Sequence, residues 1–402
     1  MNRIYLDHNA TTPVDPAVLE AMLPYLRDAY GNASSVHELG RAAREAVEKA
    51  RAQVARLLGA EPREIVFTSG GTEADNQAIR GVLELARTPE GRPGHVVTSA
   101  IEHPAVLNTC QYVAKRGHAA TYLAVDTTGR VKLAEVAPAF TPETVLVSVM
   151  LANNEIGTLQ PVREVARLAH EKGIPVHTDA VQALGRVPVD VDDLGVDLLT
   201  ISSHKIYGPK GTGALYVRRG TRIAPLLHGG HHENRRRAGT ENVPGIVGFG
   251  RACELAGERL AEVAAHEARL RDRLQQGILA RVPHVQVNGH LTERLPNTLN
   301  VGFMFVEGEG LLMNLDLEGI AVSTGSACSS GDLKPSHVLL ALGLDHAAAH
   351  GTLRFSLGRS NTEVEIDATI DAVARVVERV RAMSPMYHDF RKQQQAEAAS
   401  HA

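Results

Sequence analysis

The chain has 402 residues, 42 basic and 46 acidic residues, a net charge of −4 and three cysteines. This length allows a large core and two domains, and the balanced charge excludes the basic surface that nucleic acid or an anionic membrane would require. Three scattered cysteines exclude a disulfide framework and a structural zinc site. No stretch approaches the roughly 20 apolar residues of a membrane helix, and the first residues lack a secretory pattern. We therefore expect a cytoplasmic protein that acts on small molecules.

Helices and strands alternate through the first half of the chain. Ser35 and Glu38 have the spacing of a capping box, which predicts a helix that ends at Gly59. A strand predicted at 64–68 is followed by a glycine turn and a helix. Further strands are predicted at 96–98, 121–123, 145–149, 173–176, 196–201 and 214–217, and a helix at 162–172. This alternation predicts an α/β fold, with a mostly parallel sheet covered by helices on both faces.

The pattern changes after residue 244, where a long helical stretch runs from about 247 to 280. It is followed by predicted strands at 285–287, 298–301 and 353–356 and by helices at 309–317 and 363–383. These elements predict a smaller α+β domain, and the residues from Lys392 on have nothing to pack against and should fray. The expected division is a large domain at 16–257, a small domain at 1–15 and 258–385, and a flexible tail at 386–402.

Two of the predicted strands, 173–176 and 196–201, deliver Asp179 and Lys205 just past their ends. Ligands of such sheets bind outside the carboxyl ends of the strands. A lysine in that crevice forms Schiff bases, and a carboxylate that keeps a pyridine nitrogen protonated completes the electron sink of pyridoxal phosphate. For these two residues alone, a surface salt bridge is the alternative.

The neighbouring loops carry donors that suit the phosphate of such a cofactor. Gly71 and Thr72 lie at a strand-to-helix turn, where backbone N–H groups and a hydroxyl can hold an anion. Neither a dinucleotide fingerprint nor a P-loop pattern is present at this turn. Ser202 and His204 add donors beside Lys205. A glycine turn alone is often only geometry, and its combination with the lysine loop indicates a site for a phosphate and an aldehyde.

Three further residues follow predicted strands. His103 comes after the strand at 96–98, where its ring can stack on a flat cofactor and move protons. Asn154 follows the strand at 145–149, and Gln182 lies three residues past Asp179, so both amides can reach ring or carboxylate oxygens. A surface histidine and an ordinary turn remain the alternatives for His103 and Asn154.

From about residue 5 to 367 the chain resembles the cysteine desulfurases of the class V aminotransferase group. The segments that carry the resemblance are 5–12, 30–37, 68–76, 102–104, 177–182, 203–205, 237–240 and 323–328, in this order. The chain is most similar to the NifS and IscS branch, whose cysteine lies in a Gly-Ser-Ala-Cys segment. The resemblance implies the type I fold of pyridoxal phosphate enzymes, with a seven-stranded sheet in the large domain and pyridoxal 5'-phosphate as the cofactor.

The resemblance also implies a role for each candidate site residue. Lys205 would hold the cofactor and act in catalysis, and Asp179 would pair with the ring nitrogen. Gln182 would contact the ring hydroxyl, and His103 would stack on the ring and act in catalysis. The phosphate would be bound by Gly71, Thr72, Ser202, His204 and Thr240. Thr240 would come from the partner subunit of a homodimer. Asn32, Asn154 and Arg354 would bind the substrate, and Asn154 would also contact the cofactor. An arginine within a strand can equally form a structural ion pair.

Cys328 lies in a small, polar, glycine-flanked segment, whereas Cys110 and Cys253 lie in apolar helical contexts typical of packing residues. By the resemblance, Cys328 takes sulfur from L-cysteine as a persulfide and passes it to an acceptor such as an iron-sulfur scaffold protein, where the persulfide would be a transient iron ligand. The alternatives are a selenocysteine lyase or SufS-type desulfurase, a non-catalytic scaffold and an ordinary aminotransferase. The receiving pathway stays open.

Overall fold

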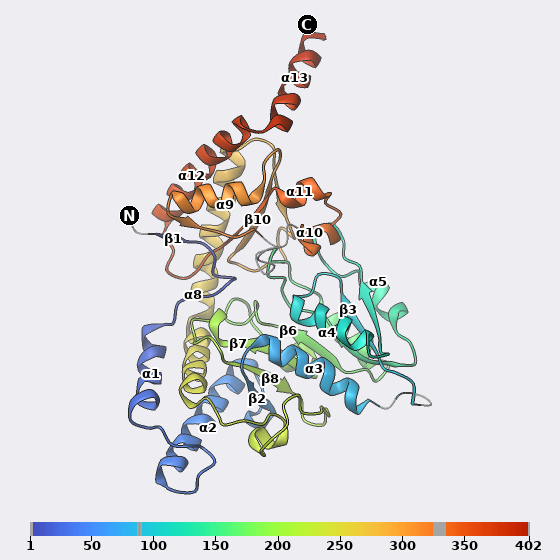
Figure 1. Cartoon of the computed structure of the whole chain (residues 1–402), viewed down its shortest axis with the longest axis vertical. Helices are drawn as coiled ribbons and strands as arrows, with labels where there is room; N and C mark the ends of the chain where they lie inside the picture. Colours follow the sequence, from blue (N-terminus) through green and yellow to red (C-terminus); the bar gives the residue numbers. More distant parts are fainter. Residues whose placement is uncertain (1–2, 87, 89–90, 325–334, 401–402) are drawn as a thin grey trace.

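The computed structural model describes residues 3–86, 88, 91–324 and 335–400. Cys328, the expected sulfur carrier, lies outside the described residues. A lower part that contains the main sheet and a smaller upper part are joined by helix α8 (Val243–Arg281), which runs from one into the other (Figure 1). Within the described ranges, none of the helices is both long and apolar enough to cross a membrane.

The main sheet has seven strands in the order β2-β8-β7-β6-β5-β3-β4. These strands are β2 (Ile65–Thr68), β3 (His95–Ser99), β4 (Ala119–Leu123), β5 (Thr144–Ser148), β6 (Val176–Asp179), β7 (Leu198–Ser202) and β8 (Gly213–Val217). Strand β8 is antiparallel to both of its neighbours, β2 and β7, and the other neighbouring pairs are parallel, so the expected mostly parallel sheet is confirmed. Strands β3, β6 and β7 are buried at every position, because helices cover both faces of the sheet.

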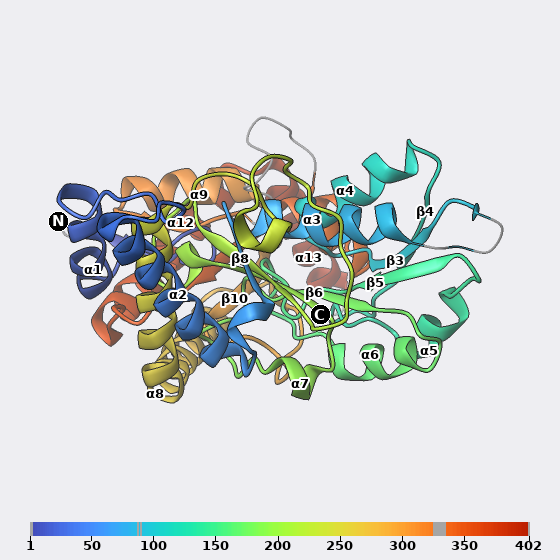
Figure 2. The same ribbon diagram turned by 90° about the horizontal axis from the view of Figure 1, so that it is seen from below.

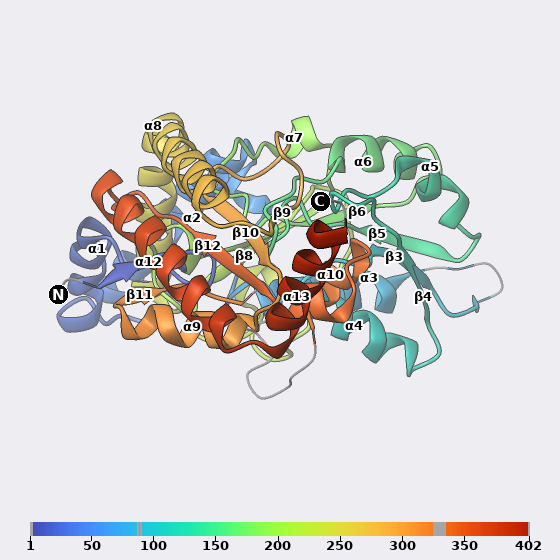
Figure 3. The ribbon, with the colours of Figure 1, turned by 90° about the horizontal axis from the view of Figure 1, so that it is seen from above.

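The helices of the lower part are α1 (Pro16–Arg27), α2 (Glu38–Leu58), α3 (Gly71–Leu85), α4 (Pro104–Ala114), α5 (Leu133–Val136), α6 (Val162–His170) and α7 (Val191–Leu194). Helices α3 and α4 lie on one face of the sheet and α6 lies on the other, as Figure 2 and Figure 3 show from opposite sides. Because helices cover both faces, the ends of the strands stay accessible, and the loops that follow the carboxyl ends can form a site there.

The start of α2 differs from the prediction. The N-cap is His37, whose side chain accepts the N–H of Gly40 at 3.3 Å, so Ser35 is not the capping residue. The predicted end is confirmed, because Gly59 forms the C-cap with φ of 68°. The imidazole nitrogen of His37 provides the acceptor that serine or aspartate usually supplies at this position.

The upper part contains two small sheets. Strand β10 (Thr298–Phe303) lies between β9 (Val285–Asn288) and β12 (Thr352–Ser356) and is antiparallel to both. Strand β1 (Ile4–Tyr5) pairs in parallel with β11 (Ile320–Ala321), so the N-terminus belongs to this part. The helices are α9 (Gly308–Leu317), α10 (His337–Ala341), α11 (His346–His350), α12 (Glu363–Ala382) and α13 (Pro385–Ser400).

Helix α8 contributes to two separate apolar cores. Phe249 and Leu255 belong to a core of the lower part, whereas Leu270 and Leu274 belong to the core of the upper part. The break between the two sets falls near the expected boundary at 257, so we propose that the domains divide there, within the 39 residues of this helix.

The described tail residues form helix α13 up to Ser400, and the expected flexibility of the tail stays a prediction. In α13 the ring of Phe390 stacks on Phe305 with centroids 4.6 Å apart, and Tyr387 contacts both rings. Residues 391–397 are exposed. The two aromatic residues precede Lys392, and they give the first half of the helix a surface to pack against.

Candidate active site

A cavity of about 290 Å³ lies at the carboxyl ends of the parallel strands. Most of the predicted site residues come together in its wall: Gly71, Thr72, His103, Asn154, Asp179, Gln182, Ser202, His204, Lys205 and Arg354. Asn32 and Thr240 are exposed and lie outside this wall, so their expected roles stay predictions. A cavity of this size, with a few convergent polar groups, is typical of a small-molecule site.

Asp179 is the last residue of β6, which begins three residues later than predicted. Gly173 has φ of 68° and Pro175 has no N–H to donate, and both delay the strand. Oδ1 of Asp179 accepts the N–H of Val181 at 2.9 Å. Burial raises the pKa of the Asp179 carboxyl, whereas this hydrogen bond and the charge of Lys205 lower it. A carboxylate at such a buried position is stabilised by a cationic partner that neutralises its charge.

Lys205 lies on the turn that follows β7. Its amine donates to the carbonyl oxygens of Asn9, at 2.5 Å, and Ala10, at 2.8 Å. Nε2 of Gln182 donates to the same carbonyl of Asn9 at 3.0 Å. The N-terminal segment, defined here as residues 7–12, therefore forms one wall of the cavity and orients two side chains from the sheet.

His103 is the N-cap of α4, and its Nδ1 accepts the N–H of Ala105 at 3.1 Å. Burial, with the charges of Lys205 and His337, lowers the pKa of His103 to about 4. The ring is therefore neutral at pH 7 and carries its proton on Nε2, because Nδ1 is the acceptor. A neutral, fixed ring at the cavity wall is suited to stacking on a planar ligand and to holding one proton at a defined atom.

The phosphate-type donors converge as expected. Gly71 begins α3, so the positive end of the helix faces the cavity beside Thr72, and Ser202 and His204 line the same wall. A Cβ on Gly71 would come within 3.0 Å of Cγ2 of Val181. A side chain here would crowd Val181, so glycine favours the close approach of the helix end.

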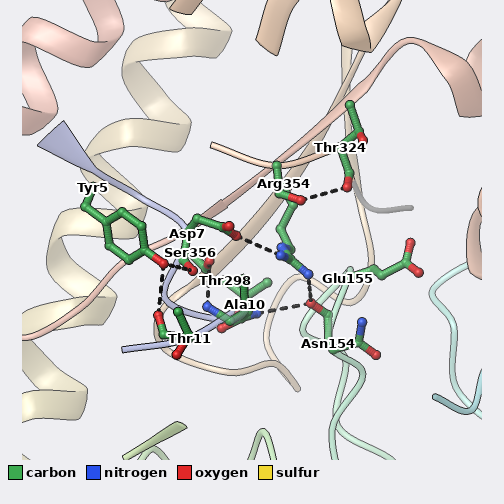
Figure 4. A network of polar contacts seen from close by, with 12 residues as sticks. Tyr5, Asp7, Ala10, Thr11, Asn154, Glu155, Thr298, Thr324, Arg354 and Ser356 are labelled. Atoms are coloured by element: carbon green, nitrogen blue, oxygen red, sulfur yellow. Dashed lines mark hydrogen bonds and ion pairs between the residues drawn. The ribbon is translucent and has the colours of Figure 1, made fainter. Parts of the chain in front are cut away.

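Arg354, on β12, is buried between two acceptors (Figure 4). Its NH2 group donates to Oδ1 of Asp7 at 2.8 Å, and its NH1 group donates to the carbonyl oxygen of Asn154 at 3.0 Å. The guanidinium thus joins β12 to the N-terminal segment and to the loop after β5. It is both a member of the cavity wall and a partner in an ion pair, so the structural alternative is confirmed and the substrate-binding role stays a prediction.

The cavity also contains residues that the sequence did not indicate. Asn9 and Ala10 act through backbone carbonyls, which carry no signal in the sequence, and Met150 lies between predicted positions. Asp75 could have been found, because it lies one helical turn after Gly71 on α3. Its Oδ1 lies 3.6 Å from Nε2 of His177, and burial raises the pKa of the Asp75 carboxyl well above its usual range.

The cavity fits pyridoxal 5'-phosphate. The chemistry of the donor set matches the phosphate, Lys205 is suited to the aldehyde, and the buried carboxylate of Asp179 is suited to the ring nitrogen. Among the described residues, Oε1 of Gln182 is buried without a hydrogen-bond partner, as expected of a group that awaits a ligand. The described part of the chain contains no group of three or more histidines, cysteines and carboxylates arranged to bind a metal ion.

Comparison with known proteins agrees with this arrangement. The chain matches the family Aminotransferase class-V over residues 4–369. It is 54% identical over 389 residues to a cysteine desulfurase of Nostoc sp., covering 97% of this chain and 96% of that protein. It is 51% identical over 383 residues to the cysteine desulfurase IscS of Methanosarcina thermophila, covering 95% and 94% of the two chains.

Solved structures give the same result. A NifS-like protein superposes with a TM-score of 0.87 at 42% identity and covers 94% of this chain and 99% of its own. A structure described as SspA in complex with cysteine has a TM-score of 0.79 at 38% identity, covering 89% of this chain and all of its own. Enzymes of this family depend on pyridoxal 5'-phosphate. The chain therefore belongs to the class-V aminotransferase family and, within it, to the cysteine desulfurases.

Proposed function

We propose that this protein removes sulfur from L-cysteine and passes it on through Cys328. The observation that carries the proposal is the convergence of Lys205 and Asp179, from two adjacent strands, in one cavity with phosphate donors. The NifS-like and desulfurase relatives support it over an ordinary aminotransferase. A non-catalytic scaffold has no use for a buried carboxylate and an oriented amine in the same cavity.

The side chains of the cavity divide the work. When bound, the cofactor supplies an electron sink that weakens the bonds of the substrate near its amino group. Asp179 holds a proton at the ring nitrogen, and His103 stacks on the ring with its own proton on Nε2. Lys205 holds the cofactor until substrate binds and then takes the proton from the substrate Cα. Arg354 and Asn154 bind the substrate carboxylate.

Cys328 performs the sulfur transfer. Its thiolate attacks the sulfur of the substrate, so an S–S bond forms as the bond between that sulfur and Cβ breaks. The electron pair of the broken bond stays with carbon, which is protonated and leaves as L-alanine. The persulfide on Cys328 is then available to an acceptor such as an iron-sulfur scaffold protein, with Cys328 as a transient iron ligand. A reduced thiol of this kind requires a reducing compartment such as the cytoplasm.

The proposal includes a homodimer in which Thr240 reaches the cavity of the partner subunit, and Asn32 is a further predicted substrate-binding residue. Both side chains are exposed in the single chain. Arg237, three residues before Thr240, donates to Oε1 of Glu73 at 2.8 Å, and Glu73 follows Thr72 directly. This contact fixes the chain just ahead of Thr240, and it supports a defined position for that residue at a dimer contact.

The test is the site of persulfide formation. After L-cysteine is added to the holoenzyme, alkylation and mass spectrometry should find the extra sulfur on Cys328, and Cys328→Ser should form no transferable sulfur. Cys110→Ser and Cys253→Ser are matched controls, because both thiols are buried and burial raises their pKa values, that of Cys110 to about 12. Normal sulfur transfer by Cys328→Ser would refute the proposed carrier.

A further inference from the structure

The N-terminal segment has a side-chain contact to the cavity that the proposed roles do not use. Asp7 continues from β1 and forms a parallel bridge with Ser356, two residues after Arg354 on β12. The N–H of His8 donates to the carbonyl of Ser356 at 3.0 Å, and the N–H of Ser356 donates to the carbonyl of Leu6 at 2.8 Å. The backbone of Asp7 is therefore held on both sides against the strand that carries Arg354.

A second contact fixes Asp7 from the opposite direction. The hydroxyl of Tyr5 lies 3.0 Å from the carbonyl oxygens of both Asp7 and Thr11, and it closes the turn of the segment (Figure 4). The carboxylate of Asp7 is 20% exposed, whereas the side chain of Arg354 is only 4% exposed. Asp7 is thus a rigidly held, partly exposed carboxylate that pairs with the buried guanidinium of Arg354.

The guanidinium of Arg354 has N–H groups that these two contacts do not use. NH1 is bound to the carbonyl of Asn154 and NH2 to Asp7, and among the described residues Nε of Arg354 is buried without a partner. A buried N–H without an acceptor is costly, so an acceptor supplied by a ligand would stabilise this one. The vacant donor belongs to a residue of the cavity wall, which indicates that a ligand acceptor completes the set.

We propose that Asp7 is a positioning residue for substrate recognition: with the carbonyl of Asn154, it fixes the Arg354 guanidinium so that the remaining N–H groups receive the α-carboxylate of the amino acid. The inference rests on the proposed function, since it takes Arg354 as the carboxylate-binding residue. Asp7 does not touch the substrate in this proposal. Its contribution is to hold a planar fork in one orientation, which two-point recognition of a carboxylate requires.

The experiment compares two probes on the holoenzyme. L-Alanine has the α-carboxylate, ethylamine has the same carbon skeleton without it, and neither reacts with a thiol. Their dissociation constants are measured by titrating the absorbance of the bound cofactor in the wild type, Asp7→Ala, Arg354→Ala and the double variant. Tyr5→Phe is the matched control, because it loosens the same segment and leaves the carboxylate and the guanidinium in place.

We expect Asp7→Ala to weaken binding of L-alanine about tenfold, the usual effect of losing one hydrogen bond between charged groups. Ethylamine should bind within about twofold of the wild type, since it makes no use of the guanidinium. Tyr5→Phe should weaken binding of L-alanine by less than Asp7→Ala does, because the carboxylate stays beside the guanidinium, and it should leave binding of ethylamine within about twofold. In the double variant, the loss for L-alanine should be no larger than in Arg354→Ala, because the two residues act as one unit.

Three results would overturn the inference. If Arg354→Ala selectively weakens L-alanine and Asp7→Ala does not, Asp7 has no positioning role while the proposed function stands. If Asp7→Ala weakens both probes equally and lowers the melting temperature, its role is structural. If Arg354→Ala does not distinguish the probes, Arg354 is not the carboxylate-binding residue and the inference is wrong with it. Failure of the proposed function itself would appear separately, as a wild type that forms no L-alanine from L-cysteine.

Discussion

Glu233 accepts hydrogen bonds from both terminal nitrogens of Arg51, at 2.7 and 2.8 Å, and from the N–H of Phe67 at 2.9 Å. The glutamate side chain is 4% exposed, and its backbone is in the left-handed region with φ of 49°. A buried ion pair with α2 and a hydrogen bond from β2 therefore hold an unfavourable turn in the stretch that leads to Thr240.

Glu233→Ala should be strongly destabilising. It leaves the Arg51 guanidinium buried without its main partner, and breaking such a pair costs about 3–5 kcal/mol. Urea denaturation measures the loss. Glu48 is a matched control, because it contacts the same guanidinium at 3.2 Å from a position that is 58% exposed. Glu48→Ala should cost less than about 1 kcal/mol, and equal losses in the two variants would contradict this account.

Lys205→Ala should abolish turnover, because the variant lacks both the amine that holds the cofactor and the base at the substrate Cα. Removal of a general base alone lowers a rate by about 10²–10⁴-fold. Borohydride treatment of the holoenzyme followed by mass spectrometry should show a cofactor adduct in the wild type and none in the variant. Lys210, which is exposed five residues later, is the control. An adduct of full yield in Lys205→Ala would show that another amine holds the cofactor.

The stability of the protein should fall as pH rises from 5 to 8, in part because of Glu102. Burial raises the pKa of its carboxyl to about 8, although hydrogen bonds from Ser99 and Met150 lower it. The folded state therefore binds a proton that the unfolded state releases near its ordinary pKa of 4.5. The resulting stability is complete below that value and is lost as pH rises through about 8.

Glu102→Gln isolates this effect, since glutamine imitates the protonated carboxyl and its oxygen can accept the same two hydrogen bonds. Between pH 5 and 8, the wild type should lose up to about 1.4 kcal/mol per pH unit relative to the variant. Chemical denaturation across this range gives the difference. Glu135→Gln, at an exposed position, should follow the wild type. Parallel curves for the wild type and Glu102→Gln would disprove the assignment.

Helix α13 should be stabilised by its first half alone. Phe390→Ala removes the stack on Phe305 and should cost about 1–2 kcal/mol, less than a fully buried phenylalanine because the ring is only half-buried. Removal of residues 391–402 should change the free energy of unfolding by less than about 0.5 kcal/mol. Thermal and urea denaturation of the two variants test this order, and the reverse order would assign the packing to the distal half.

The sequence predicts the central sheet well, because buried parallel strands are short β-branched runs with little ambiguity. The run at 196–201 and the strand β7 nearly coincide. Asp179 was placed correctly at the carboxyl end of its strand even though β6 begins later than predicted, because ligand sites in such sheets depend on where the strand ends. Helix α1 was missed, yet Asp15 accepts the N–H of Ala17 ahead of Pro16, a start signal that the sequence contains.

The N-terminal wall of the cavity was not predictable by the same reasoning. Asn9 and Ala10 receive Lys205 through carbonyl oxygens, and every residue type has that group. Asp7 and Arg354 are both visible as charged residues, but only the folded path of the chain shows that they meet. Local patterns report on local structure, and contacts of this kind depend on the tertiary arrangement.

The ion pair between Asp7 and Arg354 joins positions 347 residues apart. A ribosome must therefore synthesise almost the whole protein before Arg354 can contact Asp7, even if the strands of the main sheet have formed earlier. Contacts so distant in the chain slow the final stage of folding, and they make acquisition of a competent cavity a late event in the life of each new molecule.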